Sequence, residues 1–227
     1  MKKILIIGAS TGIGRALLEE KLKNSLVYSI SRTPPDASHS NLIHHSADIL
    51  KDPLPDIEQI DSLIYCPGSI SLKPFQSLHA DDFRNDFEIN VIGAVRVIQK
   101  YLPILKKGAD PSIVLFSTVA VKLGMPFHAS IASSKAALEG LVRSLGAELA
   151  GQVRINAVAP TITQTPLSAS ILRNDKIKES IKERHPMKNY LQAREVAQMA
   201  DYLISDSASS ISGQVFVMDY GLVSFKL

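Results

Sequence analysis

The chain has 227 residues, which is enough for one domain with a sizeable core. Its 45% hydrophobic and 21% charged residues are ordinary for a globular protein and exclude a disordered, collagen-like or coiled-coil chain. The net charge of +3 comes from 25 basic and 22 acidic residues that are interspersed along the chain, so charge gives no indication of a nucleic-acid partner.

Short runs rich in isoleucine and valine alternate with longer amphipathic segments, a pattern typical of strands and crossover helices in a parallel sheet. The predicted strands cover residues 3–7, 26–31, 41–45, 62–66, 112–118, 154–158 and 215–219. The predicted helices cover 13–23, 80–106, 128–149, 167–183 and 193–204. Prolines in 33–40 and 51–60 predict that these two connections lack a full helix.

We find no internal repeat and no linker between these elements. The sequence therefore predicts an α/β fold: a single doubly wound Rossmann domain over 1–227, with a seven-stranded parallel sheet.

A glycine-rich segment, 8–14, follows the first predicted strand and opens the first predicted helix. Gly8 permits a tight turn, Gly12 lets the backbone approach a pyrophosphate, and Gly14 allows the helix to pack closely on the strand. Free amides and the helix dipole would favour the anion, although a turn of this kind that binds nothing is the alternative. The predicted phosphate-binding residues are Gly8, Ser10, Thr11, Gly12, Ile13 and Gly14.

The spacing in this segment, G-x-x-x-G-x-G, resembles that of the short-chain dehydrogenase/reductase family, and the resemblance extends over nearly the whole chain. Asp48 matches the family aspartate that contacts adenine, and Asn90 matches the family's active-site asparagine. Two family motifs are altered, because Cys66-Pro67-Gly68 replaces Asn-Ala-Gly and Pro160-Thr161 replaces Pro-Gly. The resemblance implies that the cofactor contacts Asp48, Ile49, Cys66, Pro67, Gly68, Asn90, Lys135, Pro160, Thr161, Ile162 and Thr165.

Ser31 and Arg32 end the second predicted strand, where a cofactor without a 2′-phosphate would call for a carboxylate. A hydroxyl beside a guanidinium suits a phosphate, so we predict NADP in preference to NAD. An exposed surface arginine is the alternative. Thr11 departs from the basic residue that many NADP-dependent relatives carry in this turn.

The family's active site, as the resemblance implies it, has one gap in this chain. A family tyrosine exchanges a proton with the substrate, a lysine four residues later lowers the pKa of that tyrosine, and a hydroxyl orients the carbonyl. Lys135 matches the lysine and Thr118 the hydroxyl, but Ile131 stands where the tyrosine is expected. The chain is thus identified as an atypical member that lacks the catalytic tyrosine.

His128 precedes Ile131 by three residues, so in a helix both share one face. An imidazole is suited to proton transfer near neutral pH, although a helix-entry histidine with only local hydrogen bonds is the alternative. Ser130 and Ser134 are further candidates near the gap, and a water held by Lys135 and Asn90 would be another source of the proton.

We therefore weigh two functions. The first is an NADP-dependent enzyme that transfers hydride between nicotinamide and a small carbonyl or alcohol substrate, with Asn90, Thr118, Lys135 and His128 as its catalytic residues. The second is a sensor or scaffold that binds NADP(H) but has lost catalysis. The resemblance also implies a homodimer or homotetramer, for which Leu138, Leu141, Val142 and Leu145 offer an apolar stripe, unless that stripe covers the protein's own sheet.

The remaining expectations concern compartment and metals. A single cysteine excludes a disulfide framework, and no Cys and His spacing indicates a metal site. The apolar run after Met1-Lys2-Lys3 breaks at Gly8, and no window approaches about 18 apolar residues, so we expect neither export nor a membrane span. A cytoplasmic protein fits these observations.

Overall fold

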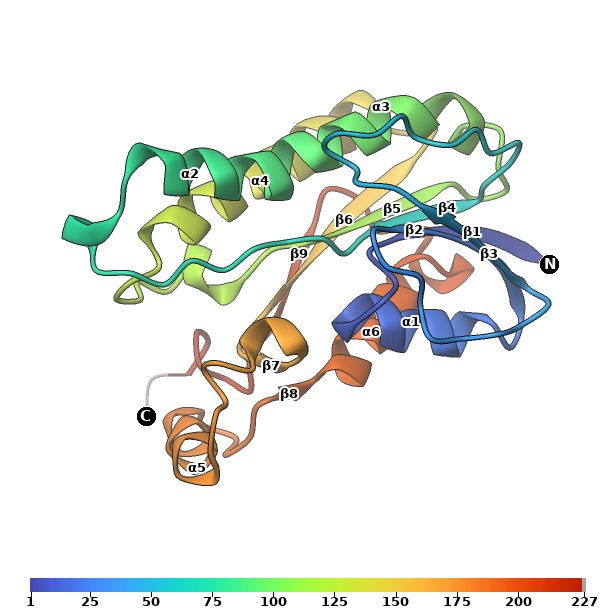
Figure 1. Ribbon diagram of the computed structural model, residues 1–227. Coiled ribbons are helices and arrows are strands. Elements are labelled where there is room, and N and C mark those ends of the chain that lie inside the picture. Colours follow the sequence, from blue (N-terminus) through green and yellow to red (C-terminus); the bar gives the residue numbers. More distant parts are fainter. Residues whose placement is uncertain (226–227) are drawn as a thin grey trace.

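The computed structural model describes residues 1–225, and its main element is a parallel sheet between two layers of helices (Figure 1). The strand order is β3-β2-β1-β4-β5-β6-β9, and every neighbouring pair is parallel. The strands are β1 Lys2–Ile7, β2 Ser25–Ser31, β3 Leu42–Ser46, β4 Ser62–Tyr65, β5 Ser112–Phe116, β6 Arg154–Pro160 and β9 Val215–Met218. The predicted Rossmann-like fold with seven parallel strands is confirmed.

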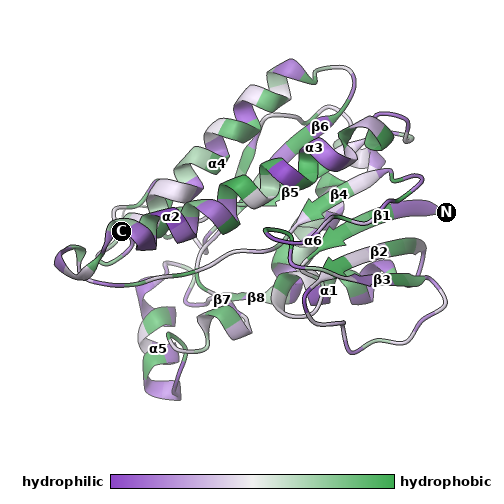
Figure 2. Cartoon of the chain, turned by 45° about the horizontal axis from the view of Figure 1, so that its top comes forward, coloured by the Kyte–Doolittle hydropathy of each residue, from purple (hydrophilic) through white to green (hydrophobic). Residues whose placement is uncertain are grey.

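The helices lie on both faces of the sheet (Figure 1). Helices α1 Gly12–Lys21 and α6 Ala193–Leu203 cover one face, whereas α2 Ala80–Phe87, α3 Gly93–Leu105 and α4 Ala129–Glu148 cover the other. In β1, Ile4 and Ile6 belong to the core under α1 and α6, while Leu5 and Ile7 belong to the core under α3 and α4. Strands buried on both faces read as continuous apolar runs, and Figure 2 shows hydrophobic residues along the strands and mixed character on the helices.

The prediction of one continuous helix over 80–106 was wrong, because the helix is interrupted. Between α2 and α3 the chain forms a π-helical turn, η2 Glu88–Ile92, in which the amide of Gly93 donates to the carbonyl of Glu88. The hydroxyl of Tyr65 donates to the carbonyl of Ile89 at 2.6 Å, and a Cβ on Gly93 would lie only 2.3 Å from that hydroxyl. Because Gly93 has no side chain, the buried Tyr65 hydroxyl can reach the carbonyl of Ile89 and bond to it. Asn90 lies in the π-helical turn formed there.

The helix predicted over 167–183 begins later than expected. A 3₁₀ turn, η4 Pro166–Ser168, is followed by irregular backbone, and helix α5 covers Asp175–Arg184. Asn174 starts α5 because its side chain accepts a hydrogen bond from the amide of Ile177. A short pair of strands that the sequence did not indicate, β7 Thr163–Gln164 and β8 Leu191–Gln192, flanks this segment.

The other predicted ranges hold to within a few residues, with one boundary that bears on the site. Strand β5 ends at Phe116, so Thr118 lies beyond the strand, with extended backbone, and caps the 3₁₀ helix η3 Val119–Val121. A further 3₁₀ helix, η1, covers Phe75–Ser77, and another, η5, covers Asp206–Ala208. Within residues 1–225, no helix combines the length and apolar character needed to cross a membrane.

Candidate functional site

A cleft of about 570 Å³ opens at the carboxyl ends of β1, β2 and β4, where the strand order reverses. Open α/β sheets bind ligands at such a reversal, because the neighbouring connections run to opposite faces. Fourteen of the residues predicted to bind the cofactor line it: Gly8, Ser10, Thr11, Gly12, Ile13, Gly14, Ser31, Arg32, Asp48, Ile49, Cys66, Pro67, Gly68 and Thr165. Ser69 and Ile89 also line the cleft, and no sequence motif indicated them.

The glycine turn after β1 has the backbone that its sequence requires. Gly8 and Gly12 have φ values of +79° and +59°, in the region that favours glycine. A Cβ on Gly14 would lie 2.2 Å from the carbonyl oxygen of Gly8, so no larger residue fits there. Thr11 begins α1 with an extended backbone, and among the described residues no side chain caps the helix. The first amides of α1 therefore remain available to an anion at the cleft.

The end of β2 places Arg32 and Ser31 differently. Arg32 is exposed at the cleft, and its guanidinium pairs with no carboxylate in the part of the chain that the structure describes. Ser31 is buried, and its hydroxyl donates to the carbonyl of Thr33 at 2.8 Å. Arg32 therefore supplies the free charge at this end of the cleft. Asp48 lies beside them, with Oδ1 accepting from the amide of Leu50 at 3.0 Å.

Asn90 and Lys135 lie next to each other behind Gly68. A Cβ on Gly68 would stand 3.1 Å from Oδ1 of Asn90 and 3.6 Å from Nζ of Lys135. Asn90 is fully buried and Lys135 is 8% exposed, with its Nζ donating to the carbonyl of Phe116 at 2.7 Å. Gly68, itself a cleft residue, thus brings both side chains to the wall of the cleft.

The electrostatic surroundings of Lys135 and Cys66 oppose charge on both groups. Burial lowers the pKa of Lys135 to about 8, while the Asp86 carboxylate and Cys66 act in the opposite direction. Burial raises the pKa of the Cys66 thiol to about 12, with Lys135 opposing. The thiol therefore stays protonated near neutral pH and does not act as a nucleophile.

The position of the missing tyrosine is filled by a buried side chain, because Ile131 is 5% exposed on α4, one turn before Lys135. His128 lies just before α4, half-buried, and its Nδ1 donates to the carbonyl of Pro126 at 2.7 Å. Nε2 is therefore the nitrogen that can meet another partner. Thr118 accepts from the amide of Ala120 at 3.3 Å, and its hydroxyl hydrogen meets no acceptor within residues 1–225.

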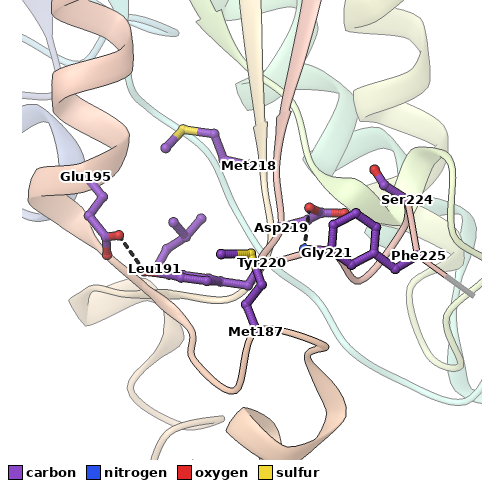
Figure 3. Close-up of a pocket in the computed structure, with 9 residues that line it drawn as sticks. All are labelled: Met187, Leu191, Glu195, Met218, Asp219, Tyr220, Gly221, Ser224 and Phe225. Atoms are coloured by element: carbon purple, nitrogen blue, oxygen red, sulfur yellow. Dashed lines mark hydrogen bonds between the residues drawn. The ribbon is translucent and has the colours of Figure 1, made fainter. Parts of the chain in front are cut away.

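Two other tyrosines have their hydroxyl hydrogens engaged elsewhere. Tyr65 donates to Ile89, and burial raises its pKa. Tyr220 lines a second cavity, of about 340 Å³, at the turn after β9 (Figure 3). Its hydroxyl donates to Glu195 of α6, and this hydrogen bond raises the pKa of Tyr220 to about 12. Neither tyrosine takes the place of the one missing beside Lys135.

The loop after β6 is anchored away from the cleft. Thr161 is buried, and its hydroxyl bonds to Nε2 of His185 at 2.8 Å. Ile162 packs against an apolar cluster formed by Leu172, Ile181 and Tyr190. The cleft lining therefore excludes three predicted cofactor contacts, Pro160, Thr161 and Ile162. Thr165 does line the cleft, and its side-chain carbons would lie 3.4 Å from a Cβ on Gly12. No sequence motif indicated His185, so sequence reasoning missed its role as an anchor.

The residues at the cleft fit a dinucleotide. The turn at Gly8, Gly12 and Gly14 offers uncapped helix amides to a pyrophosphate, and Arg32 offers an unpaired charge near the ribose end. Oδ1 of Asn90 is a buried acceptor that bonds to no group among the described residues. A buried polar atom without a partner is costly, so this oxygen indicates a ligand or water at the wall of the cleft. Within residues 1–225, no three His, Cys, Asp or Glu side chains are grouped to hold a metal ion.

Comparison with known proteins identifies similar chains. The profile of the family described as enoyl-(acyl carrier protein) reductase matches residues 18–223. The 3-oxoacyl-(acyl-carrier-protein) reductase FabG of Thermotoga maritima is 29% identical over 242 residues, which cover 98% of each chain. The NADPH-named carbonyl reductase 2 of Sus scrofa is 26% identical, over 98% of this chain and 96% of the relative.

Solved structures share the whole fold. The ligand-free aldohexose dehydrogenase of Thermoplasma acidophilum superposes with a TM-score of 0.89 at 27% identity, over 99% of this chain and 95% of that one. ElxO with NADP bound gives a TM-score of 0.86 at 25% identity, over 99% of both chains. The fold, the glycine turn and these similarities together show that the chain belongs to the short-chain dehydrogenase/reductase family of oxidoreductases.

Proposed function

We propose that the domain, 1–227, is an NADP(H)-dependent oxidoreductase that transfers hydride between nicotinamide and a small carbonyl or alcohol substrate, with a proton donor other than tyrosine. The observation that carries this proposal is the pair Asn90 and Lys135 behind Gly68, at the wall of a cleft lined by the phosphate turn. Two similar proteins, a carbonyl reductase named for NADPH and ElxO with NADP bound, support the choice of cofactor.

The predicted residues at the cleft have separate roles in this proposal, whereas Pro160, Thr161 and Ile162 have none. When bound, the nicotinamide supplies hydride to the carbonyl carbon or accepts it from the alcohol carbon. The glycine turn holds the pyrophosphate, Arg32 faces the 2′-phosphate, and Asp48 meets the adenine. Ser31, predicted as a second donor to that phosphate, gives its hydroxyl hydrogen to the carbonyl of Thr33 instead. Lys135 holds the ribose near the nicotinamide.

The substrate oxygen needs a proton when the carbonyl is reduced. Thr118 orients that oxygen through its free hydroxyl hydrogen. In its imidazolium form His128 gives the proton from Nε2 and becomes the neutral imidazole, because the hydrogen on Nδ1 stays bonded to the carbonyl of Pro126. A water between Lys135 and the unpaired Oδ1 of Asn90 is the other donor.

The burial of Ile131 favours a second candidate function, an NADP(H)-binding sensor or scaffold with weak or no catalysis. An alkyl side chain carries no proton, and the loss of a general acid costs roughly two to four orders of magnitude in rate. The cofactor cleft does not depend on that side chain, so binding would persist.

Two measurements on the purified protein distinguish the enzyme from the sensor. NADPH affinity is measured first by its fluorescence, and NADPH oxidation is then followed with aldehydes, ketones and quinones. Turnover that Lys135→Met abolishes supports the enzyme, and tight binding without turnover supports the sensor. Failure to bind NADPH rejects both.

Assembly and compartment remain proposals, namely a homodimer or homotetramer in the cytoplasm. Leu138 and Val142 are buried in the protein's own core, and Leu141 and Leu145 pack against the same core. The apolar stripe therefore covers the chain's own sheet in large part. Light scattering at micromolar concentration tests assembly, and a monomer mass would contradict it.

A further inference from the structure

Asp86, on helix α2, is a buried carboxylate that no sequence motif indicated, and it is 2% exposed. Its Oδ1 accepts from the Ser69 hydroxyl at 2.5 Å, and its Oδ2 accepts from the Ser130 hydroxyl at 2.6 Å. Its backbone carbonyl accepts from Nδ2 of Asn90 at 2.7 Å. One residue thus connects α2, the loop after β4, helix α4 and the π-helical turn beside the cleft.

The ionised carboxylate fixes the direction of these hydrogen bonds, because it can only accept. Ser69 gives its hydrogen to Asp86 and therefore accepts one from Nδ2 of Asn90, at 3.2 Å. Both hydrogens of the Asn90 amide are then used, and Oδ1 is left on the side of Gly68. A flipped amide would set two oxygens 2.7 Å apart, against the Asp86 carbonyl.

Asp86 also lies near Lys135, because its Oδ2 bonds to Ser130 of α4, five residues before that lysine. Burial disfavours the ammonium, and Asp86 is the first opposing influence, followed by Cys66. Glu139, one turn along α4 from Lys135, is engaged elsewhere, since Oε1 accepts from Ser117 at 2.7 Å and Oε2 lies 3.6 Å from Arg143. Asp86 is therefore the carboxylate that offsets the burial of Lys135.

We propose that Asp86 is a positioning residue of this site, which turns the Asn90 oxygen toward the cleft and places a negative charge beside the segment of α4 that carries Lys135. The assignment rests on the proposed function only for what Asn90 and Lys135 do to a bound cofactor. Both effects exist in the protein without cofactor, and they are measured there.

The charge effect is tested by NMR titration of ¹³C-lysine protein, with the Lys135 Cε resonance assigned from Lys135→Arg. Asp86→Asn should lower the midpoint of Lys135 by about one pH unit, as expected when a nearby opposite charge is removed. Ser130→Ala removes a hydrogen bond to the carboxylate but not its charge, so the midpoint should stay near that of the natural protein. Asp81→Asn, the same change at an exposed carboxylate of α2, is the matched control. An unchanged midpoint in Asp86→Asn overturns the proposal.

The hydrogen-bond direction is tested with Ser69→Ala, which keeps the charge and remains informative if Asp86→Asn does not fold. The Nδ2 hydrogens of Asn90 should then exchange with water about tenfold faster, because one of their two acceptors is lost. Ser71→Ala, in the same loop, is the control. Exchange at the natural rate in Ser69→Ala overturns the proposal. Absence of turnover in the natural protein would reject the proposed enzyme and leave both of these measurements standing.

Discussion

The hydroxyl of Thr161 donates a hydrogen bond of 2.8 Å to Nε2 of His185, and both side chains are buried. The direction follows from the other ring nitrogen, since Nδ1 of His185 donates to the carbonyl of Ile181 at 2.7 Å. This bond joins the loop after β6 to the end of α5. In the proposed enzyme we expect residues 161–187, which follow β6, to face the substrate, and this bond ties the far end of that segment back to the end of the central strand β6.

Thr161→Val should loosen that segment, because it removes the donor at nearly constant volume and leaves Nε2 of His185 buried without a partner. The cost is about 1 to 3 kcal/mol, the usual penalty for an unpaired buried polar group. Limited proteolysis should then cut residues 166–187 faster than in the natural protein. Thr161→Ser keeps the hydroxyl and should keep the resistance, so equal cleavage of Thr161→Val and Thr161→Ser would contradict the anchor.

Local features of the site could be predicted from the sequence, and those that depend on distant partners could not. The phosphate turn follows from three glycines within seven residues, and the structure gives two of them positive φ. The π-helical turn depends on the hydrogen bond from Tyr65 to Ile89, which passes close to Gly93. The helical periodicity of the sequence gives no sign of this contact. Asp86 is equally hidden, because Ser130 lies 44 residues away in the chain. From sequence alone, an aspartate on a polar helix is predicted to be exposed to solvent, because most aspartates are.

Arg32→Ala should weaken NADPH binding by about 1.5 to 3 kcal/mol and affect NADH little, because a charge-assisted contact to the 2′-phosphate is lost. Calorimetry with both cofactors measures this. Arg84→Ala, on the exposed side of α2, is the control and should leave both affinities unchanged. Equal affinities of the natural protein for NADPH and NADH would refute the preference for NADP.

Lys135 should make stability depend on pH in a defined direction. Its pKa falls from 10.5 in the unfolded chain to about 8 in the folded protein, so between these values the unfolded chain binds the proton that the folded protein releases. The contribution of Lys135 to stability is therefore complete above pH 10.5 and is lost as pH falls through about 8. Lys135→Met removes this dependence.

Urea denaturation of the two proteins measures the effect as a difference, so other titrating groups cancel. The free energy of unfolding of Lys135→Met, relative to the natural protein, should be higher at neutral pH than at pH 10.5. Lys122→Met, at an exposed position in the loop before α4, should show no such trend. If the difference in unfolding free energy between the two proteins stays constant over this pH range, the pKa of Lys135 is not lowered in the folded protein.

His128→Ala separates the two proton sources in the proposed enzyme. If Nε2 of His128 gives the proton, kcat should fall by about two to four orders of magnitude while NADPH affinity stays the same, since the loss lies in the transition state. His79→Ala, at the start of α2, is a control for removing an exposed imidazole. Turnover that survives His128→Ala would assign the proton to the water at Lys135 and Asn90. The two serines predicted as further candidates are buried, and their hydroxyl hydrogens are bonded to Asp86 in the case of Ser130 and to the carbonyl of Ile131 in the case of Ser134.

Ile131→Tyr should raise turnover, because it places a phenol one helical turn before the buried ammonium of Lys135. The larger ring must enter a buried position, so the stability of the variant is measured alongside its rate, and Ile131→Phe reports the effect of the ring without the hydroxyl. A gain in Ile131→Tyr that Ile131→Phe lacks isolates proton transfer as the missing function. If the natural protein binds NADPH, turns over no carbonyl compound and gains activity only through this change, the sensor is the correct function. A folded Ile131→Tyr that is no faster than the natural protein would show that a proton donor beside Lys135 does not limit this site.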